Sequence, residues 1–161
     1  MAKVLIVDDH AAIRRGVQAI LHPFPEWEFC GEADNGNDAI RLADALKPDV
    51  IIMDVSMPGL NGIEATRVIC RTQPEVKIVL LTLHDSAELV RSAFRAGARG
   101  YLLKTDAEQE LVRALVAIVG QGAYFSQKID NQVVEGVIKE MGISHRSSGS
   151  DPELQESNPG Q

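Results

Sequence analysis

Five short apolar runs alternate with longer stretches of helical periodicity, and this alternation constrains the fold more than any other feature of the chain. The five runs are residues 4–7, 29–33, 50–53, 77–81 and 100–103. Most are nearly continuous in apolar residues, which is typical of strands covered on both faces. The sequence therefore predicts an α/β domain in which a parallel sheet lies between two layers of helices.

The stretches between the runs carry apolar residues three and four positions apart, as one face of an amphipathic helix does. In the first stretch these residues are Ile13, Val17 and Ile20. A proline or glycine ends each stretch, at positions 23, 48, 74, 97 and 120. Five strand and helix units fit within residues 1–122, and the chain of 161 residues is the length of one domain with some chain to spare.

The chain after residue 122 has a different character. Ser126 can cap a sixth helix, whose apolar stripe runs from Ile129 to Met141 and is expected to pack against the domain or a partner. Residues 144–161 are rich in serine, glycine and proline, and Leu154 is their one large apolar residue. The predicted organisation is a domain at 1–122, a linker with an extra amphipathic helix at 123–143, and a disordered acidic tail at 144–161.

Charge and composition exclude several classes of function. The formal charge of −7, from 16 basic and 23 acidic residues, is opposite in sign to the usual nucleic-acid-binding surface, so we expect no direct nucleic acid contact. Two cysteines without metal-ligand spacing favour a reducing compartment. The first apolar run is too short for a secretory signal, and the longest uncharged stretch, 114–127, is shorter than the ~18 residues of a spanning helix. These features predict a cytoplasmic protein with no membrane contact.

Reactive side chains follow four of the five predicted strands. Asp8 and Asp9 end the first strand, Asp54 the third, Thr82 the fourth and Lys104 the fifth. Ligands of an open parallel sheet bind at the carboxyl ends of its strands, so we expect these side chains to converge on one rim. Three carboxylates at one place repel one another unless a cation neutralises them.

A hard divalent cation is the usual partner of crowded carboxylates, and Mg²⁺ binds to one or two of them together with water and phosphate oxygens. Lys104 supplies a positive charge for a phosphoryl oxygen, and the hydroxyl of Thr82 can donate a hydrogen bond to another. Asp54 is then the candidate nucleophile, because a carboxylate that attacks an activated phosphoryl group forms an aspartyl phosphate. Each residue alone has an ordinary structural explanation, but their coincidence on one rim predicts a site.

These residues also carry a resemblance to a known family. The Asp8-Asp9 pair, the run DVSMPGLNG from Asp54, Thr82 and the run YLLK that ends at Lys104 resemble the receiver domain of two-component response regulators. The similarity extends over residues 1–122. It implies an α/β flavodoxin-like (βα)₅ three-layer sandwich with the parallel strand order 2-1-3-4-5, to which the C-terminal helix is added.

The resemblance implies a metal-dependent phosphoacceptor site. Asp54 would be the phosphoacceptor and would receive the phosphoryl group from a histidine kinase. Asp9 would bind Mg²⁺ directly, Asp8 would bind it mainly through water, and the backbone carbonyl of Ser56 would complete the protein ligands. Lys104 would pair with the phosphate.

The resemblance also implies a switch. Thr82 would move to the phosphoryl oxygen, and the ring of Tyr101 would turn inward into the space it leaves, so that the protein-interaction surface changes. The family acts in phosphorelay signal transduction, here with a link to transcription regulation. It implies a signalling protein and not an enzyme, with only self-phosphorylation from small donors and autodephosphorylation. His84, two residues after Thr82, occupies a position that influences the phosphate lifetime in this family.

The alternative function is that of a Mg²⁺-dependent phosphohydrolase with an aspartate nucleophile. In the haloacid-dehalogenase-like form of that class the nucleophile follows the first strand, whereas Asp54 follows the third. A flavodoxin would need a hydroxyl-rich and glycine-rich phosphate loop where this chain has Asp8, Asp9 and His10. His10 has no predicted role beyond the first helical turn.

The runs at 100–104 and 122–126 resemble the LuxR-type (NarL/FixJ-like) subfamily, which attaches a helix-turn-helix domain after such a linker. Too few residues follow Gly122 for that domain. We therefore expect either a free-standing receiver with an unknown downstream protein partner or a chain from which the DNA-binding domain was removed. A homodimer formed on phosphorylation through the sixth helix is a further hypothesis. Lys104-Thr105 stands where many receivers have Lys-Pro with a cis peptide, which leaves its geometry open.

Overall fold

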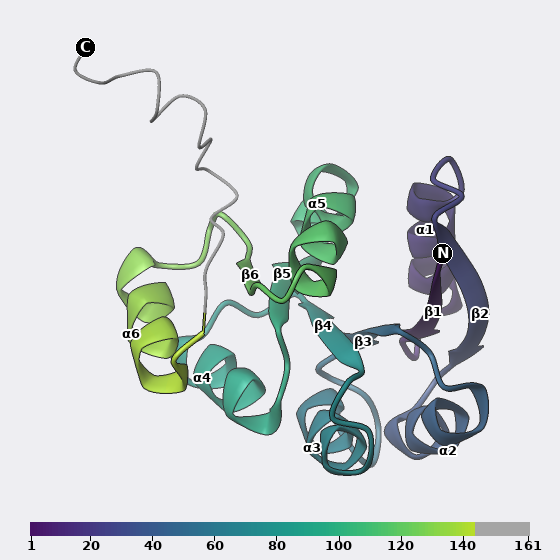
Figure 1. Ribbon diagram of the computed structural model, residues 1–161, viewed down its shortest axis with the longest axis horizontal. Coiled ribbons are helices and arrows are strands. Elements are labelled where there is room, and N and C mark those ends of the chain that lie inside the picture. The colour runs from purple at the N-terminus through teal and green to yellow at the C-terminus, as the bar shows by residue number, and fades with distance from the viewer. Residues whose placement is uncertain (144–161) are drawn as a thin grey trace.

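The computed structural model describes residues 1–143 and contains a six-stranded sheet between layers of helices (Figure 1). The strands are β1 (Ala2–Val7), β2 (Trp27–Ala33), β3 (Val50–Asp54), β4 (Lys77–Thr82), β5 (Gly100–Leu103) and β6 (Tyr124–Phe125). The helices are α1 (Ala11–Leu21), α2 (Gly36–Leu46), α3 (Gly62–Thr72), α4 (Ala87–Ala96), the short 3₁₀ turn η1 (Lys104–Asp106), α5 (Ala107–Val119) and α6 (Asn131–Met141). The predicted alternation of strands and helices is confirmed.

All neighbouring strands of the sheet are parallel, and their order is β2-β1-β3-β4-β5-β6. This order confirms the predicted order 2-1-3-4-5 for the first five strands. The strand order reverses between β1 and β3, where Val4 pairs with Val50 and Val7 with Met53. The carboxyl ends of β1 and β3 therefore lie side by side, which is where ligands bind in this class of fold.

Helices cover both faces of the sheet (Figure 1). Buried residues of α1 and α5, such as Val17 and Leu111, pack on one face with Ile6 and Ile52. Buried residues of α2, α3, α4 and α6 form a second cluster on the other face. Each strand of the centre is thus covered twice, which explains why its sequence is apolar on both faces.

β6 is a strand that the sequence analysis does not predict. Tyr124 pairs with Gly100 and Phe125 with Tyr101, so two residues that were expected in a linker extend the sheet beyond β5. The ring of Phe125 stacks on that of Phe94 in α4, with centroids 4.6 Å apart. The strand is too short to give an apolar run of its own, and pairing with the edge of β5 and packing on α4 hold it in place.

α6 lies beside α4 and packs its apolar stripe on the same chain (Figure 1). Val134 and Val137 are buried in the cluster that contains Val90 and Phe94 of α4. The cap predicted for this helix is wrong: Asp130 is the N-cap, and its side chain accepts a hydrogen bond from the backbone N–H of Gln132 at 2.7 Å. The predicted tail at 144–161 lies outside the described residues.

The described part of the chain contains no helix long and apolar enough to cross a membrane. Within the same residues all peptide bonds are trans, so the Lys104–Thr105 peptide is trans as well.

Candidate functional site

Asp54 is the last residue of β3 and is almost completely buried, at 4% exposure. The loop that follows it folds back against the strand end, where the backbone N–H of Gly62 donates a hydrogen bond to the carbonyl oxygen of Val55 at 2.9 Å. A Cβ atom at position 62 would overlap the carbonyl oxygen of Asp54. Only glycine fits this approach, so Gly62 fixes the loop from Val55 to Asn61 over the acid.

Asp8 and Asp9 follow β1 and lie beside Asp54. Asp8 is buried, and its Oδ1 accepts a hydrogen bond from the backbone N–H of His10 at 2.8 Å. Arg14 of α1 donates to the backbone carbonyl of Asp8 at 2.6 Å, which holds the turn after the strand. Asp9 is partly exposed, with 24% of its side chain accessible. The turn therefore presents one buried and one accessible carboxylate.

Lys104 connects the two buried acids. Its Nζ lies 2.9 Å from Oδ2 of Asp8 and 3.3 Å from Oδ2 of Asp54. The lysine is the first residue of η1 directly after β5, and its side chain reaches across the rim with 11% of its surface exposed. The predicted convergence of these strand ends is what the structure shows.

The crowding of these charges shifts two pKa values. Burial and the neighbouring charge of Asp8 raise the pKa of Asp54, and the ammonium of Lys104 offsets only part of that effect. Burial alone would lower the pKa of Lys104, but its hydrogen bond to Asp8 and the charges of Asp54 and Asp8 outweigh it, so the pKa is raised. The lysine thus stays protonated next to a carboxylate that is harder to ionise than usual.

Oxygen atoms at this rim fit a hard divalent cation. The carboxylates of Asp8, Asp9 and Asp54 and the ring of His10 can each offer a ligand atom, and these four atoms lie within 4.8 Å of one another. Oδ1 of Asp9 is buried and accepts no hydrogen bond within the described residues, while the buried Oδ2 of Asp8 contacts the ammonium of Lys104. Carboxylate oxygens gathered in one place are ligands that Mg²⁺ prefers. Residues Asp8, Asp9 and Asp54 could therefore hold the predicted metal.

The backbone of Ser56 is tied to the acid by a hydrogen bond from its N–H to Oδ1 of Asp54 at 3.3 Å. This contact places the residue at the rim. The role of its carbonyl oxygen as a metal ligand stays a prediction.

Thr82 and Tyr101 are linked through the backbone of His84. Oγ1 of Thr82, at the end of β4, accepts a hydrogen bond from the N–H of His84 at 3.1 Å. The hydroxyl of Tyr101 donates to the carbonyl oxygen of His84 at 2.7 Å, and the ring is fully buried. The two predicted switch residues thus bond to the same residue of the loop after β4, one to its N–H and one to its carbonyl oxygen.

His10 also lies beside the site, although the sequence predicted no role for it there. Its Nδ1 lies 3.2 Å from Oδ1 of Asp9 and 3.3 Å from Oδ1 of Asp8, while most of the side chain is exposed. It is the N-cap residue of α1 and makes no side-chain cap hydrogen bond. Its position directly after the aspartate pair is the signal that could have included it.

The geometry agrees with a comparison of the sequence with protein families. The response regulator receiver domain family matches residues 4–116. The chain belongs to this family. Its members act in two-component signalling, and the predicted family and fold are confirmed.

Curated relatives of this receiver are named as response regulators or, in one case, as a transcriptional regulatory protein. It is 40% identical to the response regulator GacA of Pseudomonas aeruginosa over 133 residues, which cover 83% of this chain and 62% of that protein. It is 37% identical to the transcriptional regulatory protein DegU of Brevibacillus brevis, of which it spans 56%. UvrY of Escherichia coli K12 is 40% identical over 96% of this chain and 72% of its own length. The receiver thus spans between about half and three quarters of these relatives.

Solved structures show the same fold. A LuxR-family response regulator from Aurantimonas sp. SI85-9A1 superposes with a TM-score of 0.76 at 31% identity, over 88% of this chain and 99% of that one. The receiver domain of the putative regulator NarL of Mycobacterium tuberculosis gives 0.69 at 32% identity, over 74% and 96%. The isolated receiver of RcsB from Salmonella enterica, solved with the phosphomimetic BeF₃⁻, gives 0.73 at 26% identity, over 82% and 97%.

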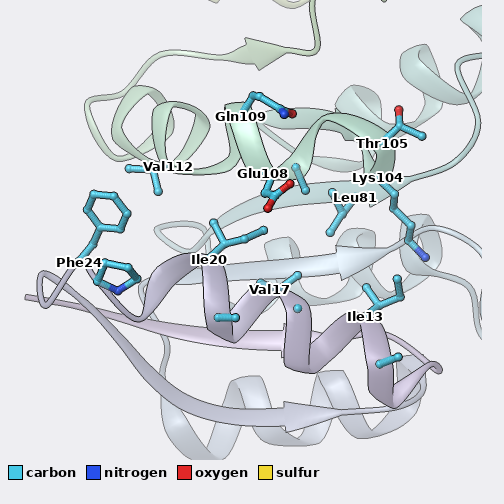
Figure 2. A pocket seen from close by; sticks show the side chains of 15 residues that line it. Ile13, Val17, Ile20, Phe24, Leu81, Lys104, Thr105, Glu108, Gln109 and Val112 are labelled. Carbon is cyan, nitrogen blue, oxygen red and sulfur yellow. The ribbon is translucent and has the colours of Figure 1, made fainter.

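A groove lies between α1 and α5 of the receiver and ends at the site (Figure 2). It has a volume of about 740 Å³ and is mostly apolar along its length. Ile20 of α1 and Val112 of α5 lie on opposite sides of it toward the end with Phe24, and Ile13 lies at the end with Lys104. Lys104 lines the end nearest the acids, so the groove leads from an apolar surface to the charged rim.

Proposed function

We propose that this receiver accepts a phosphoryl group on Asp54 in a Mg²⁺-dependent step and thereby changes its interaction surface. The observation that carries the proposal is the position of Lys104, whose Nζ contacts both Asp8 and Asp54. A cation at this place can follow the phosphoryl oxygens from donor to acceptor. The buried acceptor carboxylate beside it is poorly hydrated and is held in one orientation by the N–H of Ser56.

Asp8, Asp9 and Asp54, with the carbonyl oxygen of Ser56, would hold the Mg²⁺. When bound, the ion supplies positive charge that offsets the repulsion among the carboxylates and the phosphoryl group. The buried Oδ1 of Asp9, which accepts no hydrogen bond within the described residues, supports this assignment. His10 lies at the open side of the same cluster, where 68% of its side chain is exposed.

The transfer is an in-line displacement at phosphorus. A carboxylate oxygen of Asp54 forms a bond to phosphorus while the bond from phosphorus to the nitrogen of a phosphohistidine breaks. The bonding electrons leave with the imidazole, and the product is an aspartyl phosphate. Lys104 stays paired with the phosphoryl oxygens throughout, since its raised pKa keeps it charged.

A histidine kinase is the proposed donor. The groove beside Lys104 supports a protein donor, because an apolar groove between two helices can take up the apolar face of a partner helix. A partner that fills it would place a histidine at its end beside Asp54. Small phosphoryl donors would reach the same site from solvent through the accessible side of Asp9.

Phosphorylation would act on the loop after β4. The hydroxyl of Thr82 would donate a hydrogen bond to a phosphoryl oxygen. To do so it would move, and the hydrogen bond that it now accepts from the N–H of His84 would change its geometry. Tyr101 is already inward and holds the carbonyl of His84, so loop and ring respond together. The surface around α4, β5 and α5 would change as a result.

The output is proposed to be regulation of transcription in the cytoplasm through a protein partner or through a homodimer. The relatives are named as transcriptional or response regulators, which supports the link to transcription. Val116 and Val119 are exposed apolar residues on α5 and support an interface there. The stripe of α6 is buried against α4, so a dimer through that stripe would require α6 to leave its place.

Incubation with acetyl phosphate and Mg²⁺ tests the proposal. We expect each chain to gain one phosphoryl group, seen by intact-mass spectrometry, and Asp54→Asn to gain none. Continuous release of phosphate from a phosphate monoester, which is not an activated donor like acetyl phosphate, would instead support the phosphohydrolase alternative. Omission of Mg²⁺ should abolish incorporation into the wild type.

A further inference from the structure

We propose that Ser126 is a positioning residue for Lys104 and that it holds the turn after β5 in the geometry that phosphoryl transfer needs. This inference rests on the proposed function. The sequence gives this serine only a place in a linker run and a predicted role as a helix cap. Its place in the structure points to the positioning role.

Ser126 bonds to three points along the segment that contains Lys104. Its backbone N–H donates to the carbonyl oxygen of Tyr101 at 2.9 Å. Its Oγ accepts from the N–H of Leu103 at 3.1 Å and donates to Oδ2 of Asp106 at 3.1 Å. The serine itself is 2% exposed. One buried side chain therefore fixes the residue before Lys104 and the second residue after it.

The bond to Leu103 completes the edge of the sheet. β6 ends at Phe125, which pairs with Tyr101, so no further strand residue is available to accept from the N–H of Leu103. The side chain of Ser126 takes the place of a backbone carbonyl at this point. Without it, a buried N–H directly before Lys104 would have no acceptor, and such a group favours a rearranged backbone.

The bond from Ser126 engages the carboxylate of Asp106, which would otherwise be free to cap the start of α5. Asp106 is the N-cap residue of α5 but makes no cap hydrogen bond. Its carboxylate instead accepts from Ser126 and pairs with Nζ of Lys128 at 3.3 Å. An aspartate at this position normally bonds the first free N–H groups of its helix. In this chain the carboxylate does not stabilise the start of the helix in that way. Its contacts with Ser126 and Lys128 instead connect η1 to the segment after β6.

These contacts give Lys104 little freedom. It is the first residue of a 3₁₀ turn of three residues, and Ser126 bonds to the residue before that turn and to its last residue. A shift of the serine would move the lysine relative to Asp8 and Asp54. Because Ser126 leads directly into the turn before α6, the same contacts couple the site to the C-terminal segment.

The test compares Ser126→Ala with a matched control in the full chain. The readout is the rate at which acetyl phosphate phosphorylates Asp54 in saturating Mg²⁺, with thermal unfolding measured on the same samples. We expect Ser126→Ala to slow phosphorylation about tenfold, as displacement of a group that contacts the transferred phosphoryl group does. Ser126→Thr restores the hydroxyl and should recover most of the lost rate. Asp49→Ala removes the carboxylate that accepts a hydrogen bond from the backbone N–H of Lys3 at 2.7 Å, directly before β3 and so at the end of the sheet opposite the site. It should destabilise the fold without slowing the reaction.

A folded Ser126→Ala protein that reacts within twofold of the wild type would overturn the inference. So would an equal slowing by Asp49→Ala, since that result would trace the effect to general loss of stability. If Ser126→Ala does not fold, Ser126→Cys keeps the size of the side chain with weaker hydrogen bonding, and a wild-type rate for it would also overturn the inference. Failure of the wild type to be phosphorylated at Asp54 is a separate result that removes the proposed function and this inference together.

Discussion

The hydroxyl of Tyr101 lies 2.7 Å from the carbonyl oxygen of His84 and donates a hydrogen bond to it. This bond joins a fully buried side chain of β5 to the loop after β4, two residues beyond Thr82. A change at Thr82 and a change at the α4 surface are therefore connected by one backbone residue. The connection is the physical basis of the switch that we propose.

Removal of this hydroxyl should loosen the loop. Tyr101→Phe leaves the carbonyl of His84 without its donor, and we expect the free energy of unfolding to fall by about 1 kcal/mol. Hydrogen exchange should become faster at the backbone amides of residues 83–86 and stay unchanged in β2. Unchanged exchange in the loop would contradict the proposed coupling.

Stability should also fall at high pH because of the same residue. Burial raises the pKa of Tyr101 to about 12, despite a hydrogen bond with Thr82 that lowers it. Since the pKa in the folded state lies above the unfolded value of about 10, the contribution of this group is complete below pH ~10 and is lost as the pH rises toward 12. Urea unfolding across this window should show the loss in the wild type and a smaller loss in Tyr101→Phe. An equal loss of stability with pH in the two proteins would show that the ionisation of Tyr101 is not its cause.

Lys104 should stabilise the fold by neutralising two buried acids. Lys104→Met leaves Asp8 and Asp54 without a cation and should lower the free energy of unfolding by about 2–3 kcal/mol when Mg²⁺ is absent. Lys47→Met removes an exposed ion pair with Asp44 and should change the free energy of unfolding by no more than ~0.5 kcal/mol. Equal effects of the two substitutions, measured by urea titration, would contradict the central place given to Lys104.

Mg²⁺ should stabilise the protein through the same acids. At a free concentration about 100 times Kd, a ligand that binds only the folded state adds about 2.7 kcal/mol. Asp9→Asn should remove most of this stabilisation in a thermal shift assay, whereas Asp34→Asn, in an exposed loop, should keep it. Since the pKa of Asp54 is raised, Mg²⁺ binding should weaken on acidification at a higher pH than ordinary carboxylates require. A full response to Mg²⁺ in Asp9→Asn would place the metal elsewhere.

Gly62 should tolerate no side chain. A Cβ atom there meets the backbone carbonyl of Asp54, which cannot move without displacing the acid, so Gly62→Ala should cost about 2–4 kcal/mol and slow phosphorylation. Gly136 lies within α6 with open space around it. Gly136→Ala should therefore stabilise the protein by about 0.5–1 kcal/mol and leave phosphorylation unchanged. If both variants lost similar stability, the close approach of Gly62 to the carbonyl of Asp54 would not be the cause of the loss in Gly62→Ala.

The sequence predicted the central sheet well because its strands are buried on both faces. Runs such as 50–53 have no polar face, and the position of Asp54 directly after one of them placed it at the rim. The same rule brought Lys104 to Asp8 and Asp54, which the structure shows as contacts. The chemical roles of these residues remain predictions that the experiments above address.

Other features depended on tertiary contacts that no local pattern reveals. β6 has two residues and exists because the edge of β5 and the ring of Phe94 are available to it. Ser126 has the residue type of a helix cap, but the sheet edge and Asp106 use its hydroxyl instead, and Asp130 caps α6. The start of β2 at Trp27 follows from pairing with Ala2, which an apolar run beginning at Phe29 could not indicate.

The role of Asp54 as phosphoacceptor is tested by locating the phosphoryl group after reaction with acetyl phosphate and Mg²⁺. Reduction with borohydride converts an aspartyl phosphate to homoserine, which peptide mass spectrometry can map. We expect homoserine at position 54 alone, and none in the Asp54→Asn variant. Homoserine at position 8 or 9, or phosphoryl incorporation that persists in Asp54→Asn, would contradict the assignment of Asp54 as the phosphoacceptor.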